Sequence, residues 1–321
     1  MNLGEIFTNL IFSLNATMPI FFMMVLGFWL KKINFLDENT NIKLNQLVFK
    51  IFLPALVFMD LAKEDFTSIW DTKLVVFCFV VTVISIAAAV VLSLLSRDKA
   101  ERGEIIQAAY RSGAATLGIA FMTNIYDNAS MVALMIIGSV PLYNVAAVVI
   151  LYLTSPQNTN QSKAELWKKT AKNVITNPII IGIALGMLWS VFKLPQPVMF
   201  TKTVTYLGNM ASPLALIALG ASFEFYDVKE KWKETVGVTC TKLLLWCMIF
   251  LPIAIYMGFR EQKLVAILVM LGSATTSSCF IMSKNMGHRG VISSCAVMVT
   301  TLLSSFTLTM WLFVLRMGGY I

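Results

Sequence analysis

Charge is scarce in this sequence, and so are the side chains that most enzymes use. Of its 321 residues 13% are charged and 58% are hydrophobic, and the mean hydropathy is +0.77. A soluble domain of this length needs far more charge to cover its surface. There is one histidine, and the HExxH, P-loop and Gly-x-Ser-x-Gly patterns are absent. These absences argue against an enzyme and against an ATP-driven pump.

The sequence also lacks paired cysteines and mid-span carboxylates. Five cysteines lie in apolar segments without a CxxC pair, which indicates small buried residues rather than disulfides or metal ligands. No acidic residue lies in the middle of an apolar segment, which counts against a sodium/proton antiporter. Asp60 and Glu224 stand at segment ends, where we expect interfacial positions. His288 is expected in a solvated turn.

Long apolar runs fill the chain instead, and they predict an all-α polytopic membrane protein. Each run is about the length that crosses roughly 30 Å of hydrocarbon as a helix. We expect ten transmembrane helices. The predicted spans are residues 10–30, 44–62, 73–95, 105–126, 131–153, 174–193, 203–222, 236–259, 262–282 and 290–315.

Lysine and arginine in the connections predict the orientation. The connections that follow odd-numbered spans hold fifteen of these residues, and the opposite set holds seven. We therefore expect a protein integral to the cytoplasmic (inner) membrane, surrounded by membrane lipid, with both termini outside the cytoplasm. This asymmetry accounts for the net charge of +8, so no nucleic-acid partner is expected.

The two halves of the chain repeat each other at an offset of 159 residues. Pro19 and Gly27 in the first span correspond to Pro178 and Gly186 in the sixth. The GxAT segments that begin at 113 and 272 share the same offset. Five spans per copy is an odd number, so the second copy must be inverted in the membrane. A duplication kept only for packing is the alternative.

The repeat predicts two domains and a crossover between them. Residues 1–153 form the first five-helix repeat, 154–172 a cytoplasmic connecting loop, and 173–321 the second, inverted five-helix repeat. The fourth and ninth spans are poor continuous helices, because glycines and hydroxyl side chains weaken them. We predict that both helices are broken and cross near mid-membrane, at Gly113–Thr116 and Gly272–Ser277. Small residues that only allow close helix packing are the alternative.

Three basic residues fall inside predicted spans. Lys50 has apolar neighbours on both sides, and a charge near mid-bilayer costs at least about 2.5 kcal/mol, so it normally has a partner or a function. Snorkelling toward the cytoplasm is the alternative. Arg111 and Lys242 lie nearer the cytoplasmic ends of their spans, and for them snorkelling is the favoured interpretation.

Substrate contacts are predicted from the crossover and from polar residues in neighbouring spans. Broken-helix N-termini offer N–H groups and partial positive charge to an anion. Tyr143 and Asn144 place two hydrogen-bonding side chains in an apolar span, which is costly unless both are satisfied inside. No cofactor or metal is expected. The predicted substrate-binding residues are Lys50, Gly113, Ala114, Ala115, Thr116, Tyr143, Asn144, Asn209, Ser273, Thr275, Thr276 and Ser277.

Taken in order, several segments resemble the auxin efflux carrier family, including its bacterial malate-permease-like members. They are MPIFFMMVLGFWLKK, FKIFLPALVF, SVPLYN at 139–144, NPIIIGIALGML at 177–188 and NMASPLALIALGASF at 209–223. The resemblance implies inverted five-helix repeats, crossover fourth and ninth helices, and transport of organic carboxylates. It also implies that a lysine placed like Lys50 belongs to a polar support site beside the substrate. The chain departs from the family at Gly113 and Ala120, where members often carry Asn and Pro.

We therefore expect a secondary active transporter (a permease or efflux carrier) for a small organic anion such as a malate-like carboxylate, working by alternating access. A passive anion channel and a substrate-sensing membrane receptor with the same cavity are the alternatives. Proton coupling and a homodimer are left open, and no residue indicates which acid is carried.

Overall fold

The computed structural model describes residues 18–19, 21–62, 71–96, 98–114, 122, 125–126, 130–156, 172, 175–222 and 230–321. Over these residues the chain is helical and contains no strand, as the composition predicted. After the helical residues 21–32, the first half contains α2 (Glu38–Leu47), η1 (Val48–Phe52), α3 (Leu53–Ala62), α4 (Thr72–Ser93), η2 (Lys99–Glu101), α5 (Arg102–Tyr110) and α7 (Ser130–Leu153). The second half contains α9 (Pro178–Val191), α10 (Val198–Ala221), α12 (Trp232–Cys240), η4 (Thr241–Leu245), α13 (Trp246–Tyr256), α14 (Glu261–Gly272), α15 (Ser278–Asn285) and α16 (Val291–Met317).

Several of these helices are long and apolar enough to cross a membrane. Six such stretches occur among the described residues: Glu38–Ala62, Thr72–Ser93, Leu134–Leu153, Val198–Ala221, Trp232–Tyr256 and Val291–Met317. The α9 helix is apolar but shorter. The fourth and ninth predicted spans are absent from this set, because each of them is interrupted where the structure describes it.

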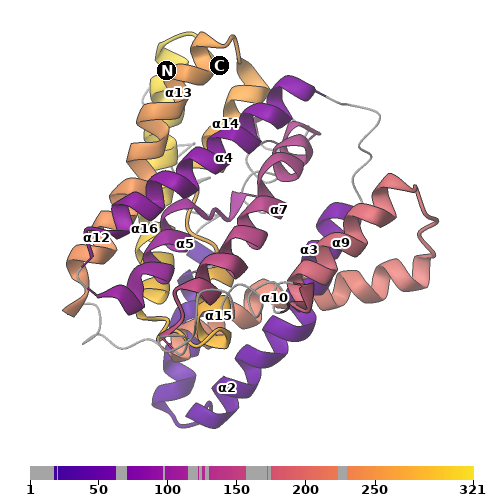
Figure 1. Cartoon of the computed structure of the whole chain (residues 1–321), viewed down its shortest axis with the longest axis vertical. Coiled ribbons are helices and arrows are strands. Elements are labelled where there is room, and N and C mark those ends of the chain that lie inside the picture. Colours follow the sequence, from indigo (N-terminus) through magenta and orange to yellow (C-terminus); the bar gives the residue numbers. More distant parts are fainter. Residues whose placement is uncertain are drawn as a thin grey trace.

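The helices form two groups, which lie on opposite sides of Figure 1. In the first group α3 contacts α9 and α10, and α10 also contacts α2. We call this group, together with residues 21–32 and η1, the frame. In the second group α4 contacts α5 and α7, α13 contacts α14, and α16 contacts α12, α14 and α15. We call this second group, with η4, the crossover bundle.

Glycines bring the backbones of the frame close together. A methyl group on Gly186 would lie 2.8 Å from the carbonyl oxygen of Phe58, and a methyl group on Gly27 would collide with the backbone of Ile217. Neighbouring backbone cannot move aside as a flexible side chain can. These glycines therefore fix the helix crossings of the frame, as small residues do between membrane helices.

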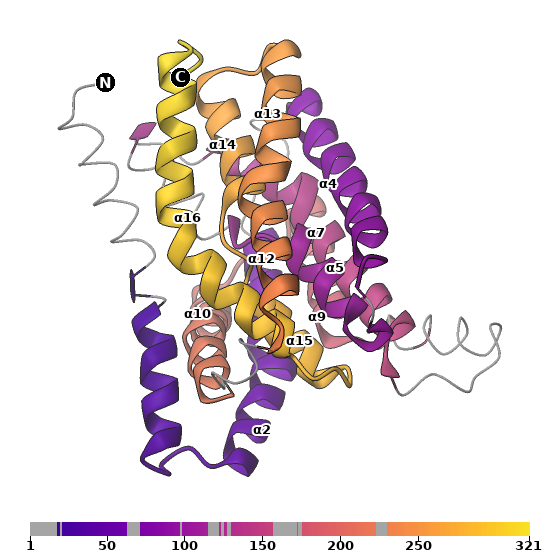
Figure 2. The same ribbon diagram turned by 90° about the vertical axis from the view of Figure 1, so that its left-hand side faces the viewer.

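In the crossover bundle both weak helices end near the positions where the sequence predicted a break. The α5 helix ends at Tyr110, and Arg111 that follows is extended, with ψ 139°. The α14 helix ends at Gly272, and Ser273 is extended with ψ 159° before α15 begins. In Figure 2 the bundle stands beside α10, with α14, α13 and α16 running in the same general direction.

The ends of the two helices lie in contact with each other. The amide of Gly113 donates to the carbonyl of Ala274 at 2.9 Å, and the hydroxyls of Ser112 and Ser273 are hydrogen-bonded to each other. The Thr275 hydroxyl donates to the carbonyl of Ala108 in α5 at 2.9 Å. Ala115 and Thr116, which were also assigned to the crossing, lie outside the described residues.

His288 corrects the expectation of a solvated turn. The side chain is 5% exposed, and its ring nitrogens lie 3.2 Å from the carbonyl oxygen of Ala100 and 2.9 Å from that of Leu151. The connection between α15 and α16 folds inward against the first half of the chain, so the imidazole holds two segments together instead of facing water.

Candidate functional site

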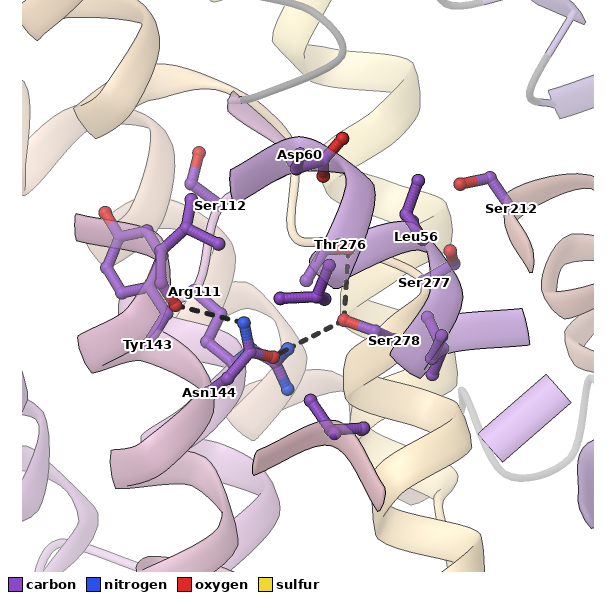
Figure 3. A pocket seen from close by; sticks show the side chains of 15 residues that line it. Leu56, Asp60, Arg111, Ser112, Tyr143, Asn144, Ser212, Thr276, Ser277 and Ser278 are labelled. Carbon is purple, nitrogen blue, oxygen red and sulfur yellow. Dashed lines mark hydrogen bonds between the residues drawn. The ribbon is translucent and has the colours of Figure 1, made fainter. Parts of the chain in front are cut away.

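A cavity of ≈ 80 Å³ lies between the frame and the crossover bundle, at the crossing of the broken helices. Figure 3 shows its lining side chains. The lining residues are Leu53, Leu56, Val57, Asp60, Arg111, Ser112, Gly113, Val140, Tyr143, Asn144, Ile179, Ser212, Thr276, Ser277 and Ser278. Because the two walls belong to different helix groups, a relative movement of the groups would change the cavity.

The two walls differ in chemistry. The crossover bundle contributes most of the polar groups, through the ends of α5 and α15 and the middle of α7. The frame contributes mainly apolar side chains from α3 and α9. The exceptions on the frame are Ser212 and Asp60. Asp60 was expected at the membrane interface, and the structure instead places it in the lining of the cavity.

Arg111 is the central cation of the polar wall, and its burial corrects the snorkelling interpretation. The side chain is 2% exposed. Its Nη2 donates to Asn144 Oδ1 and to Ser278 Oγ, both at 2.8 Å (Figure 3), and its Nη1 lies 2.8 Å from Met282 Sδ and 3.4 Å from Gln107 Oε1. The guanidinium stays inside because α5 ends immediately before it, so the chain carries it into the crossing and not along a helix toward the cytoplasm.

The charge of Arg111 is hydrogen-bonded but not neutralised within the described residues. Its four acceptors there are an amide oxygen on Asn144, one on Gln107, a hydroxyl and a thioether, and no described carboxylate forms an ion pair with it. Its Nε is buried and has no acceptor among the described residues. A buried cation of this kind is costly unless an anion compensates it. The arrangement is therefore suited to binding an anion.

The start of α15 adds a second attraction for negative charge. Ser277 and Ser278 begin this helix on the cavity wall, and no side chain caps its N-terminus. In α15 the amides of Cys279 and Phe280 already donate to the carbonyls of Thr276 and Ser277, but the helix N-terminus still carries partial positive charge. The hydroxyls of Thr276 and Ser278, 3.2 Å apart, lie on the same wall. An anion beside Arg111 would meet these donors as well.

The structure brings about half of the predicted site residues to this cavity. Those that line it are Gly113, Tyr143, Asn144, Thr276 and Ser277. Ala114, Ser273 and Thr275 are buried at the crossing and do not line the cavity.

Two predicted residues lie elsewhere. Lys50 is exposed on η1, and Asn209 is exposed on α10; neither lines the cavity. Sequence reasoning missed Arg111, although one signal was available. Arg111 stands two residues before Gly113, where the helix was predicted to break, and a basic residue at a break cannot snorkel along the helix.

A buried, unneutralised cation beside crossed broken helices, in a protein with bilayer-length helices, is the arrangement of a membrane transporter. Comparison with known families agrees. The model of the membrane transport protein family matches residues 12–312, so the chain belongs to that family. This is the auxin efflux carrier family that the sequence motifs resemble.

Two relatives show how far the likeness extends. The chain is 21% identical over 311 residues to an "Uncharacterized transporter" of Methanothermobacter thermautotrophicus, an alignment that covers 94% of this chain and 98% of the relative. It is also 25% identical over 155 residues to a "Putative malonate transporter" of Rhizobium meliloti. This second alignment covers 46% of this chain and 47% of that protein.

Proposed function

We propose that this protein is a secondary transporter for a short organic carboxylate, which binds between the frame and the crossover bundle. The observation that carries the proposal is Arg111, a buried guanidinium that lines the cavity and has only neutral partners among the described residues. Its planar fork matches the two oxygens of a carboxylate.

The size of the cavity favours a small substrate. A volume of ≈ 80 Å³ holds about six water-sized groups, at roughly 10–15 Å³ for each. That is close to the number of non-hydrogen atoms in a short mono- or dicarboxylic acid. Since one relative is described as a malonate transporter, malonate is the first acid to test.

The position of the cavity between two helix groups supports a mechanism of alternating access. One wall belongs to the frame, whose helices are held by backbone contacts at glycines, and the other belongs to the crossover bundle. Rocking the crossover bundle against the frame would open the cavity to one side of the membrane and then to the other. In this proposal the protein lies in the inner membrane, and both of its termini are outside the cytoplasm.

Equivalent contacts support the inverted five-helix repeats that this motion needs. Gly27 lies against Ile217, and Gly186 lies against Phe58. Gly27 and Gly186 are 159 positions apart, and so are Phe58 and Ile217. The same contact thus occurs twice, with the halves exchanged, as two repeats related by a twofold axis require. We propose ten helices on this basis, the fourth and ninth of them broken.

Uptake into proteoliposomes tests this function. We expect radiolabelled malonate to accumulate faster when unlabelled malonate is present inside, because a carrier must return its site across the membrane. A channel would give flux without this acceleration, and a sensor would bind malonate without flux. The same measurements with acetate, malate and succinate test other short carboxylic acids. If none of these acids is bound or taken up, the proposed substrate class is wrong.

Proton coupling can be measured in the same vesicles. Asp60 is the acidic residue among the described lining residues, so it is the proposed proton carrier. An inwardly directed proton gradient should accelerate uptake by the wild type and not by Asp60→Asn. Equal responses of the two proteins would remove Asp60 from this role.

A further inference from the structure

Lys242 is a buried cation outside the cavity, and its position corrects the expectation that it snorkels. It lies in η4, a short π-helical turn between α12 and α13, and its side chain is 1% exposed. Its Nζ donates to the carbonyl of Leu271 at 2.6 Å and lies 3.4 Å from that of Met270. These are carbonyls of the last turn of α14, immediately before the break at Gly272.

The next turn of the same helix contains Trp246, which is hydrogen-bonded to α5, the other broken helix. Trp246 Nε1 donates to the carbonyl of Ala109 at 2.8 Å, in the last turn of α5. Lys242 and Trp246 are four residues apart and therefore share a face of their helix. Figure 2 shows α12 and α13 as one continuous rod beside α14 and α16. One helix thus supplies donors to the C-terminal ends of both broken helices.

These two helix ends are unfavourable for an anion. The C-terminus of a helix carries roughly half a negative charge, so α5 and α14 together direct about one negative charge toward the crossing. Trp246 satisfies a carbonyl without changing this charge. Lys242 satisfies two carbonyls and adds a positive charge at the same place. Within the described part of the chain no carboxylate pairs with it, and its titratable neighbours are Cys247 and Cys279.

We propose that Lys242 is a positioning residue that offsets the negative ends of the broken helices, so that the crossing stays positive and selects anions. The proposal rests on the anion-transport function given above. The connection to the cavity is short. Four residues lie between Leu271 and Thr276, and two of them, Ser273 and Ala274, are hydrogen-bonded to the opposite break.

Two neutral substitutions separate charge from capping. Lys242→Met removes the charge and both hydrogen bonds and keeps a flexible chain of similar length. Trp246→Phe removes a helix-end hydrogen bond of the same kind and changes no charge. Lys242→Arg keeps the charge. We expect Lys242→Met to weaken malonate binding about tenfold, as loss of a nearby charge in protein of low dielectric does. Lys242→Arg should recover most of the affinity, and Trp246→Phe should leave it within about twofold.

A second measurement does not depend on the substrate. Ser277→Cys places a thiol on the cavity wall, in a Cys240→Ser background that removes the exposed native cysteine; the other four cysteines are buried. The rate of labelling by an anionic thiosulfonate, divided by that of a cationic one, reports the local potential. We expect Lys242→Met to lower this ratio about tenfold, and Trp246→Phe to leave it unchanged.

The outcomes decide between the two proposals. A ratio that falls only when the charge is removed supports the role of Lys242, even if malonate proves not to be the substrate. A ratio that Lys242→Met leaves unchanged, or that Trp246→Phe lowers equally, shows that Lys242 is only a helix cap and overturns the inference.

Discussion

Replacing Arg111 by methionine should abolish most anion binding while leaving the fold intact. Methionine has a similar length and no charge, so the substitution removes the guanidinium without opening a large cavity. A hydrogen-bonded charge pair buried at a binding site is worth about 2–5 kcal/mol when one partner is removed. The dissociation constant of a bound carboxylate should therefore rise roughly thirtyfold or more.

The effect on stability is expected to be small, because two contributions oppose each other. Without Arg111 the Asn144 Oδ1 loses its donor, and a buried acceptor left unpaired costs about 1–3 kcal/mol. Ser278 keeps its bond to Thr276, whereas Gln107 Oε1 loses the longer bond of 3.4 Å and only its Nε2 keeps a partner, the carbonyl of Cys279. The substitution also removes a buried charge without a described counter-ion, which relieves several kcal/mol of desolvation. The two terms cancel to within about 2 kcal/mol.

The assay combines thermal unfolding in detergent with malonate titration and proteoliposome uptake. Wild type should gain in melting temperature with malonate, whereas Arg111→Met should show a similar melting temperature without malonate and no gain with it. Arg111→Lys keeps the charge but loses the fork, so it should bind with intermediate affinity. If Arg111→Met binds and transports every acid of the series as the wild type does, Arg111 has no role in binding and the proposed site is wrong.

Three further predictions follow from described contacts. Asn144→Ala removes one of the two acceptors of Arg111 Nη2, so it should weaken malonate binding about three- to tenfold and cost about 1–3 kcal/mol of stability; unchanged binding in calorimetry would remove Asn144 from the site. Gly220→Ala should destabilise the frame by about 1–3 kcal/mol, because its methyl group would collide with backbone of the neighbouring helix. Gly237→Ala, with nothing within 4 Å of the added methyl, should stabilise α12 by up to about 1 kcal/mol, and equal unfolding for these two variants would contradict the packing argument. The hydrogen bond from Lys263 holds the pKa of Asp71 below its usual value of 3.8, so this pair stabilises the fold fully above about pH 5 and less as the pH falls through the lowered pKa. Lys263→Met should therefore cost under about 1 kcal/mol of unfolding free energy at neutral pH, and the difference from wild type should shrink as the pH is lowered through that range.

Much of the architecture could be predicted because it depends on local composition. Apolar runs of bilayer length predicted the long helices, and the membrane leaves a chain few other ways to satisfy its backbone. The breaks at Gly113 and Gly272 were also predictable, since glycine and hydroxyl side chains weaken a helix wherever they occur. The offset of 159 identified these two segments as partners before any contact was known.

The basic residues show where this reasoning stops. Lys50, Arg111 and Lys242 all occur in apolar segments, and the sequence favoured Lys50 as the functional one. In the structure Lys50 is exposed, whereas the other two are buried at the crossing. It is Lys242, and not Lys50, that contacts the carbonyls at the end of a broken helix.

The sequence by itself determined which segments are helical and where two of them break. It also determined that few charged residues lie inside the apolar segments. Only the tertiary structure decided which cation faces the cavity and which one caps a helix end. The direction of a side chain in an apolar helix depends on which neighbour covers that face, and Asn144 and Ser278 lie 33 and 167 residues from Arg111 along the chain. Contacts over such separations are set by packing of whole helices, so no local pattern around Arg111 contains them.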